Sequence, residues 1–304
     1  TIPSAFPSPT AAAIPVFMTG RAPQQHALTG WHMRFDEVQA TLAVLPLKNR
    51  EGPPLPPGFD PAKLFCAGPI FPRLAAQCSV VSPADIVDSP FTRIHSEGAR
   101  RVSYSTLEEF FARLTAIARD NASGERRYAY AYYPRLDNMA HAHGIGSDAV
   151  ARCFGRFDAL FADFLQSLAG TDTTVLLTAD HGFIDMAAQT HTVLADHPDL
   201  AQWIDEALCG EWRTVWCYAK PGGADAILDY AERHLADICK AVPSQRLIDE
   251  GWFGPGVPEP RLARRIGDVA LLMKGAHTLN DWLPHERPYL MVGVHGGASA
   301  AEMQ

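Results

Sequence analysis

The sequence lacks several features that would assign it to a particular functional class. No apolar run approaches the roughly 18 residues that a membrane-spanning helix needs. Acidic residues outnumber basic ones, 34 against 26, and a formal net charge of −8 argues against a surface that follows a phosphate backbone. There is no internal repeat and no low-complexity tract. We therefore expect no membrane span and no nucleic-acid-binding surface, and the oligomeric state stays open.

The sequence also lacks any C-x-x-C pair. Its six cysteines are scattered, at positions 66, 78, 153, 209, 217 and 239. Scattered cysteines favour buried thiols in a reducing compartment, with one or two disulfides as the alternative, and so a cytoplasmic location. The chain begins with Thr1 and stops directly after Glu302-Met303-Gln304. We expect it to be truncated at both ends, which leaves any export signal outside it.

Helical and strand patterns alternate through most of the chain. Apolar side chains recur at intervals of three and four from Val150 to Leu168, which predicts an amphipathic helix, and Ser105-x-x-Glu108 predicts a capping box. Further helices are expected at 11–18 and 224–240, and strands at 127–133, 173–179, 212–219, 267–274 and 289–294. Helices before and after each strand indicate an α/β fold with a mostly parallel central sheet flanked by helices.

The length of 304 residues suits either one large domain with an insertion or two modest domains. The density of Pro and Gly between residues 50 and 72 predicts irregular structure there. We predict a single catalytic domain over residues 1–304, with a smaller cap or insertion at about 32–105.

Asp and His side chains follow three of the expected strands. They are Asp137 and His141 after the first, Asp180 and His181 after the second, and His295 after the last. Each motif alone has a structural explanation: a helix cap with a packed His, an Asp turn, or a Gly-rich loop. Together they predict a metal site, because open α/β sheets place their active sites at the carboxyl ends of the strands.

Thr10 is the candidate nucleophile. It precedes the small, apolar stretch 11–18, so it would lie near the amino end of a helix. Free N–H groups and the helix dipole favour an alkoxide and a phosphoryl anion at that end. The structural alternative is that Thr10 only caps the helix.

These motifs, in this order, resemble the alkaline phosphatase superfamily and within it the type I phosphodiesterase / nucleotide pyrophosphatase branch, along the whole chain. The motifs are Thr10 with Thr19-Gly20, Pro23-x-x-His26, Asp137-x-x-x-His141, Thr178-Ala-Asp-His-Gly182 and His295-Gly-Gly-x-Ser-x-x-Glu-Met303. In that family the nucleophile lies ten residues before the Gly of a Thr-Gly pair, which selects Thr10 over Ser8 and Ser4.

The resemblance implies two divalent metal ions, Zn²⁺ or else Mn²⁺. One would be held by Asp137, His141 and His295, and the other by Asp180, His181 and Thr10 together with an upstream Asp. That Asp normally ends the first strand of the fold, and only nine residues precede Thr10. We expect this strand to be missing from the chain; an incomplete second site is the alternative.

The resemblance also implies an activity. It is metal-dependent hydrolysis of small-molecule phosphate esters, of the phosphodiester or pyrophosphate type, through a phosphothreonine at Thr10. Ala27 and Trp31 stand where the family usually has Gly and Asn, which puts nucleotide-type recognition in question. The alternatives are phosphomonoester or phosphonate hydrolysis at the same site, or a catalytically degenerate binding protein.

Overall fold

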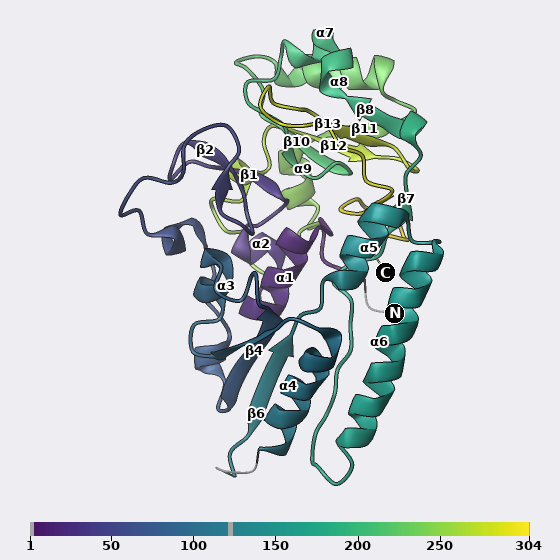
Figure 1. Cartoon of the computed structure of the whole chain (residues 1–304). Helices are drawn as coiled ribbons and strands as arrows, with labels where there is room; N and C mark the ends of the chain where they lie inside the picture. Colours follow the sequence, from purple (N-terminus) through teal and green to yellow (C-terminus); the bar gives the residue numbers. More distant parts are fainter. Residues whose placement is uncertain (1–2, 121–123, 304) are drawn as a thin grey trace.

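The computed structural model describes residues 3–120 and 124–303 and contains two main sheets with helices around each (Figure 1). The smaller sheet is parallel and has three strands. Its central strand is β4 (Gln77–Pro83), between β5 (Arg100–Tyr104) and β6 (Arg127–Ala131). Val80 and Val81 point to opposite faces of β4, so each face has its own apolar cluster.

Helices cover both faces of the parallel sheet. One face packs against α4 (Leu107–Arg119) and α6 (Asp148–Ser167), and the other against α3 (Pro90–His95) and α1 (Thr10–Thr19). The α/β fold expected from the alternating patterns is therefore present.

The larger sheet has seven strands, all antiparallel. Their order is β11 (Cys239–Pro243), β12 (Val269–Met273), β10 (Thr214–Cys217), β9 (Cys209–Gly210), β1 (His32–Phe35), β2 (Ala40–Ala43) and β3 (Lys48–Asn49). Helices α8 (Ala224–His234) and α9 (Ser244–Asp249) lie against it. The expectation of one mostly parallel sheet is wrong, because it took helix–strand alternation in one half of the chain to hold for the other half.

Shorter elements connect the two sheets. Two-stranded ladders join β13 (Thr278–Asn280) to β8 (His191–Val193) and β14 (Gly293–Val294) to β7 (Ile184–Asp185). The remaining α-helices are α2 (Pro23–His26), α5 (Arg135–His143) and α7 (Pro198–Ala201). Figure 1 places α1, α2 and α5 between the sheets. Single 3-10 turns occur at Pro61–Leu64, Phe71–Arg73, Ala188–Thr190, Leu194–Asp196 and Ala263–Arg265.

Three predicted helices form with small differences. The cap of α4 is one residue later than expected: the Thr106 hydroxyl accepts from Glu109 N–H, and the Glu109 carboxylate accepts from Ser105 N–H. Helix α6 packs against α4 through an aromatic stripe, but Phe154 lies outside this stripe and is 56% exposed. Helix α8 ends at His234 rather than at 240, because residues 239–243 pair with β12 instead.

Two predicted strands are wrong or much shorter. None of the described strands pairs with residues 173–179, and Leu176 in this segment is 90% exposed. An apolar run makes a strand only where a neighbour supplies ladder hydrogen bonds. The last expected strand, 289–294, is reduced to the two residues of β14.

Residues 32–105 contribute to both sheets. Strands β1 to β3 extend the antiparallel sheet, while β4 and β5 belong to the parallel one. The extent of a cap within these residues stays a prediction. All six cysteines are free thiols, and no helix in the described part of the chain is long and apolar enough to cross a membrane.

Candidate active site

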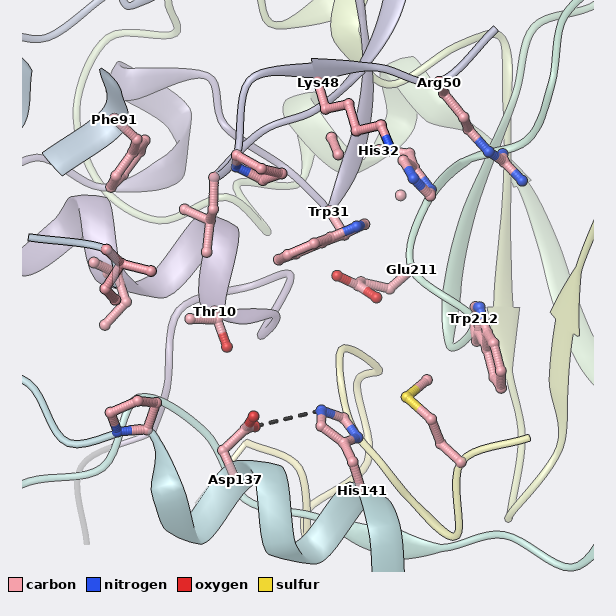
Figure 2. Close-up of a pocket in the computed structure, with 18 of the residues that line it drawn as sticks. Thr10, Trp31, His32, Lys48, Arg50, Phe91, Asp137, His141, Glu211 and Trp212 are labelled. Carbon is pink, nitrogen blue, oxygen red and sulfur yellow. Dashed lines mark ion pairs between the residues drawn. The ribbon is translucent and has the colours of Figure 1, made fainter. Parts of the chain in front are cut away.

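Helix α5 carries the first two predicted ligands. It begins at Arg135, four residues after the end of β6. Asp137 and His141 are one turn apart and so lie on the same face of the helix. Figure 2 shows both side chains turned toward Thr10 and the cavity above them. The Asp137 carboxylate is 3.5 Å from the imidazole of His141.

The ladder between β7 and β14 brings the other three predicted ligands to the same place. Asp180 and His181 lie just before β7, and His295 follows β14 directly. Because the two strands are antiparallel, the residues before one lie beside the residues after the other. The His181 and His295 rings stack with their centroids 3.7 Å apart.

Strand β14 is also attached to helix α5. The N–H of Val292 donates to the carbonyl O of His141 at 2.8 Å. Gly293 makes this approach sterically feasible, since a Cβ atom there would lie 2.5 Å from the carbonyl O of Ala140. The close spacing between α5 and the His295 loop therefore depends on a glycine, which has no side chain, at position 293.

Asp137 lies at the centre of the resulting cluster. Its Oδ1 atom is 3.5 Å from the Nε2 atoms of both His141 and His295, and 3.7 Å from that of His181. Asp180 is 3.3 Å from His181. The structure thus brings all five predicted side chains together. It does not separate them into the two predicted ligand sets, because Asp137 contacts members of both.

Backbone carbonyls fix which nitrogen of two histidines faces the cluster. The Nδ1 atoms of His141 and His181 lie 2.8 and 3.0 Å from the carbonyl O atoms of Gly293 and Gly182. A carbonyl only accepts hydrogen bonds, so both Nδ1 atoms carry the proton and both Nε2 atoms present lone pairs to the cluster. Histidines that bind metals are commonly oriented in this way.

The donor set fits a divalent cation. The Nε2 atoms of His141 and His295 are 3.2 Å apart, and at most one proton, on His295, lies between them. The buried Oδ1 of Asp137 accepts no hydrogen bond from any described group. Burial raises the pKa of Asp137 and lowers the pKa of His295 well below its usual value. Buried lone pairs that converge without donors are stabilised by a cation, and N and O donors without thiolate suit Zn²⁺ or Mn²⁺.

Thr10 is the first residue of α1, and its hydroxyl lies 3.1 Å from Nε2 of His181. Pro9 occupies the N-cap position, so Thr10 does not cap the helix. The two nearby serines are engaged elsewhere: Ser8 donates to the carbonyl O of Gly297, and Ser4 donates to that of Asp180. Thr10 is therefore the hydroxyl of this segment that faces the cluster.

A buried ion pair lies behind the His295 loop. The guanidinium of Arg213 donates to both oxygens of Glu302 at 2.9 and 2.8 Å, and both side chains are fully buried. The same carboxylate accepts from Gly297 N–H and from the hydroxyl of Ser299. The carbonyl O of Glu302 accepts from Gly182 N–H, next to His181. This pair ties together the loops that carry two of the predicted ligands.

A cavity of about 1300 Å³ opens above the cluster. Thr10, Asp137, His141 and His295 line it. Glu211, Trp31 and Trp212 line it too, and Figure 2 shows Glu211 and Trp31 across from Asp137 and His141. Sequence reasoning missed Glu211 and Arg213. Both lie in the hairpin between β9 and β10, where no spacing or periodicity distinguishes a site residue from a turn residue.

Other histidines stay outside the cluster. The Nδ1 atom of His26, in the Pro23-x-x-His26 motif, accepts from Leu28 N–H, and burial lowers the pKa of His26 to about 3. His143 is exposed at the end of α5, as is Arg135 at its start. These residues support the fold or face solvent.

Comparisons with known proteins give a family and related folds. A family model described as type I phosphodiesterase / nucleotide pyrophosphatase matches residues 1–298. Mouse ectonucleotide pyrophosphatase / phosphodiesterase 5, an inactive variant bound to AMP, superposes with a TM-score of 0.72 at 14% identity, covering 99% of this chain and 76% of that one. The human protein gives 0.70 at 15% identity, with 99% and 76% covered. Phosphonoacetate hydrolase from Sinorhizobium meliloti, bound to phosphonoformate, gives 0.68 at 16% identity, with 99% and 79% covered.

No curated protein sequence matches the chain. At these identities the solved structures show a shared fold, that of the alkaline phosphatase superfamily, and the family and its structural neighbours together indicate a phosphoester hydrolase. The family model, which matches residues 1–298, shows which family the chain belongs to. The chain belongs to the type I phosphodiesterase / nucleotide pyrophosphatase family.

Proposed function

We propose that the protein hydrolyses organic phosphodiesters with Thr10 as the nucleophile. The observation that carries this proposal is the position of the Thr10 hydroxyl, 3.1 Å from His181 and beside a cluster of five Asp and His side chains. The inactive threonine-to-alanine variant of the mouse relative supports a threonine in this role.

We propose that Asp137, His141, His295, Asp180 and His181 hold two divalent metal ions. Such ions would lower the pKa of a coordinated hydroxyl and offset the charge that develops on phosphorus-bound oxygens. The chain itself orients the proposed ligands. Backbone carbonyls orient His141 and His181. The Asp137 carboxylate lies within 3.7 Å of His181 and 3.5 Å of both His141 and His295. Thr10 alone would be too weak an acid to ionise near neutral pH.

The proposed reaction has two displacements. In the first, the Thr10 oxygen loses its proton to solvent and forms a bond to phosphorus while the bond to the leaving-group oxygen breaks. The leaving alcohol takes up a proton from solvent. In the second, a water oxygen replaces the Thr10 oxygen on phosphorus, which regenerates the hydroxyl. Free backbone N–H groups at the start of α1 lie next to Thr10 and favour the phosphoryl anion.

The cavity favours a diester over a small phosphonate or an unsubstituted phosphate. Its volume of about 1300 Å³ exceeds what a phosphoryl group needs, and its wall includes aromatic side chains such as Trp31, Trp212 and Tyr289. A phosphodiester would fill this space with its two organic arms. Hydrolysis of a phosphomonoester or a phosphonate at the same centre is the second candidate, and the phosphonoacetate hydrolase structure is its support.

The test is a comparison of Thr10→Ala with Thr10→Ser. Purified protein loaded with Zn²⁺ or with Mn²⁺ is assayed on bis-p-nitrophenyl phosphate, p-nitrophenyl phosphate and phosphonoacetate, and its metal content is measured. We expect the wild type to prefer the diester. Thr10→Ala should lose at least about 1,000-fold in kcat at near-normal metal content, because a covalent route cannot proceed without its nucleophile.

Thr10→Ser, which keeps a hydroxyl at the same position, should retain substantial activity and should form a phosphoserine detectable by mass spectrometry of acid-quenched protein. Appreciable turnover by Thr10→Ala would contradict the covalent route. A preference for p-nitrophenyl phosphate or phosphonoacetate would favour the second candidate.

A further inference from the structure

Glu211 lines the cavity across from Asp137 and His141 (Figure 2). It follows Gly210 in the hairpin between β9 and β10, and its N–H donates to the carbonyl O of Thr214 at 2.8 Å. Gly210 has a φ of +90°, and a Cβ there would lie 2.2 Å from that same oxygen. The His295 loop packs against the side chain, since a Cβ on Gly296 would meet Glu211 Cβ at 2.9 Å.

The carboxyl group has no cationic partner. Among the described residues, no Lys, Arg or His forms an ion pair with Glu211, and its one hydrogen bond comes from the backbone N–H of Trp31. Burial raises the pKa of Glu211 to about 8, and the nearby Asp137 raises it further while the Trp31 N–H opposes the change. The raised pKa reflects how costly an ionised carboxylate without a counter-charge would be there. A ligand that supplied a positive charge would favour the ionised form of Glu211.

Two indole rings accompany this carboxyl group. Figure 2 shows it directed into the cavity, with Trp31 on one side and Trp212 on the other. Trp31 is 38% exposed, although it is a large apolar residue. Trp212 is braced by Trp282 and Tyr289, with ring centroids 5.8 and 5.3 Å away. Aromatic faces next to a carboxylate attract organic cations, and quaternary ammonium groups above all.

Three cationic side chains, Lys48, Arg50 and Arg287, also line the cavity, and none of them forms an ion pair with Glu211. Arg50 is neutralised by Asp281 and Glu286, at 2.8 and 2.9 Å. Lys48 lies with His32 on the far side of Trp31 from Glu211 (Figure 2). Among the residues labelled in Figure 2, the charged side chains nearest Thr10 are the acidic Asp137 and Glu211.

We propose that Glu211, Trp31 and Trp212 form a subsite for an alkylammonium group on the ester arm of the substrate that is not displaced. This inference rests on the proposed function. It narrows the substrate class to phosphodiesters that carry a positive charge on one arm. The carboxylate supplies the counter-charge and the two indoles enclose the alkyl groups.

Two p-nitrophenyl diesters test the proposal. Both p-nitrophenylphosphorylcholine and bis-p-nitrophenyl phosphate release p-nitrophenolate, so they differ only in the retained arm, which is cationic in one and neutral in the other. We expect Glu211→Gln to lower kcat/KM for the cationic ester by about 10- to 100-fold, the range for a lost contact with a charged group. Its effect on the neutral ester should stay within about threefold. Trp31→Leu should resemble Glu211→Gln, and Trp31→Phe should retain most of the preference.

A control and a second readout keep the test decisive. Glu206→Gln removes a carboxylate that pairs with Arg34 outside the cavity, and it should change neither substrate. Calorimetric binding of tetramethylammonium should weaken by at least tenfold in Glu211→Gln, and this measurement does not depend on turnover. Equal losses on both esters, or unchanged tetramethylammonium binding, would overturn the subsite. If the wild type hydrolyses neither ester but binds tetramethylammonium through Glu211, the proposed reaction fails and the subsite stands.

Discussion

Removing Arg213 tests whether the buried ion pair positions the candidate ligands. In Arg213→Met the Glu302 carboxylate would remain fully buried and lose both guanidinium hydrogen bonds. Breaking one partner of a buried pair costs about 3–5 kcal/mol in the free energy of unfolding. Glu302 keeps two donors, Gly297 N–H and the Ser299 hydroxyl, so we expect about 3 kcal/mol, the lower end of that range.

The pair also has a predictable pH dependence. Hydrogen bonds and charge from Arg213 outweigh burial and hold the pKa of Glu302 below its usual value of 4.5. A carboxyl group whose pKa is lowered by folding stabilises the native state above its unfolded pKa, and that contribution is lost as the pH falls through the folded pKa. Without Arg213, burial should raise the pKa of Glu302 above its unfolded value. In the variant Glu302 should therefore destabilise the native state at neutral pH, and this cost should shrink as the pH falls through the raised pKa, which is the opposite of the wild-type trend.

Urea unfolding followed by circular dichroism measures the stability change, and competition with a chelating dye measures Zn²⁺ affinity. We expect the affinity of Arg213→Met to fall by about 10- to 100-fold, the usual effect of losing an outer-shell partner. The control is Arg233→Met, which breaks an exposed i,i+4 pair with Asp229 and should cost no more than about 0.5 kcal/mol. If Arg213→Met unfolds like this control and binds Zn²⁺ normally, the pair does not position the ligands and the reasoning is refuted.

The other predictions concern the spacing and charge of the cluster. Gly293→Ala should destabilise the protein by about 2 kcal/mol or more and weaken Zn²⁺ binding, because its Cβ would lie 2.5 Å from the carbonyl O of Ala140; a normal unfolding midpoint would show that the loop relaxes freely. Treatment with a chelator should lower the melting temperature and abolish turnover, and Zn²⁺ should restore both, since a ligand that binds only the native state stabilises it; a chelator-treated protein with full activity would rule out metal dependence. Asp137→Asn should reduce bound metal more than any single histidine substitution, because Asp137 contacts three histidines; metal analysis by mass spectrometry checks this ranking.

Apolar patterns in the sequence predicted the positions of three helices well. Helices α1, α4 and α6 form close to their expected bounds. Strand predictions were weaker. Residues 173–179 have the composition of a strand, yet none of the described strands pairs with them. Composition reports a side chain's preference for a pleated surface, whereas a strand needs a partner elsewhere in the chain.

The order and spacing of Thr10, Asp137, His141, Asp180, His181 and His295 were enough, by themselves, to indicate the family and to name the side chains that meet. Local sequence could do this because short motifs follow or begin particular elements, and the fold of the family sets where those elements end. Only the tertiary structure decided that most strands are antiparallel, that Arg213 and Glu302 support the cluster from behind, and that Glu211 enters the cavity between two indoles. These contacts join residues distant in the chain, such as Trp31 and Glu211, and no periodicity in the sequence encodes which distant segments fold against each other.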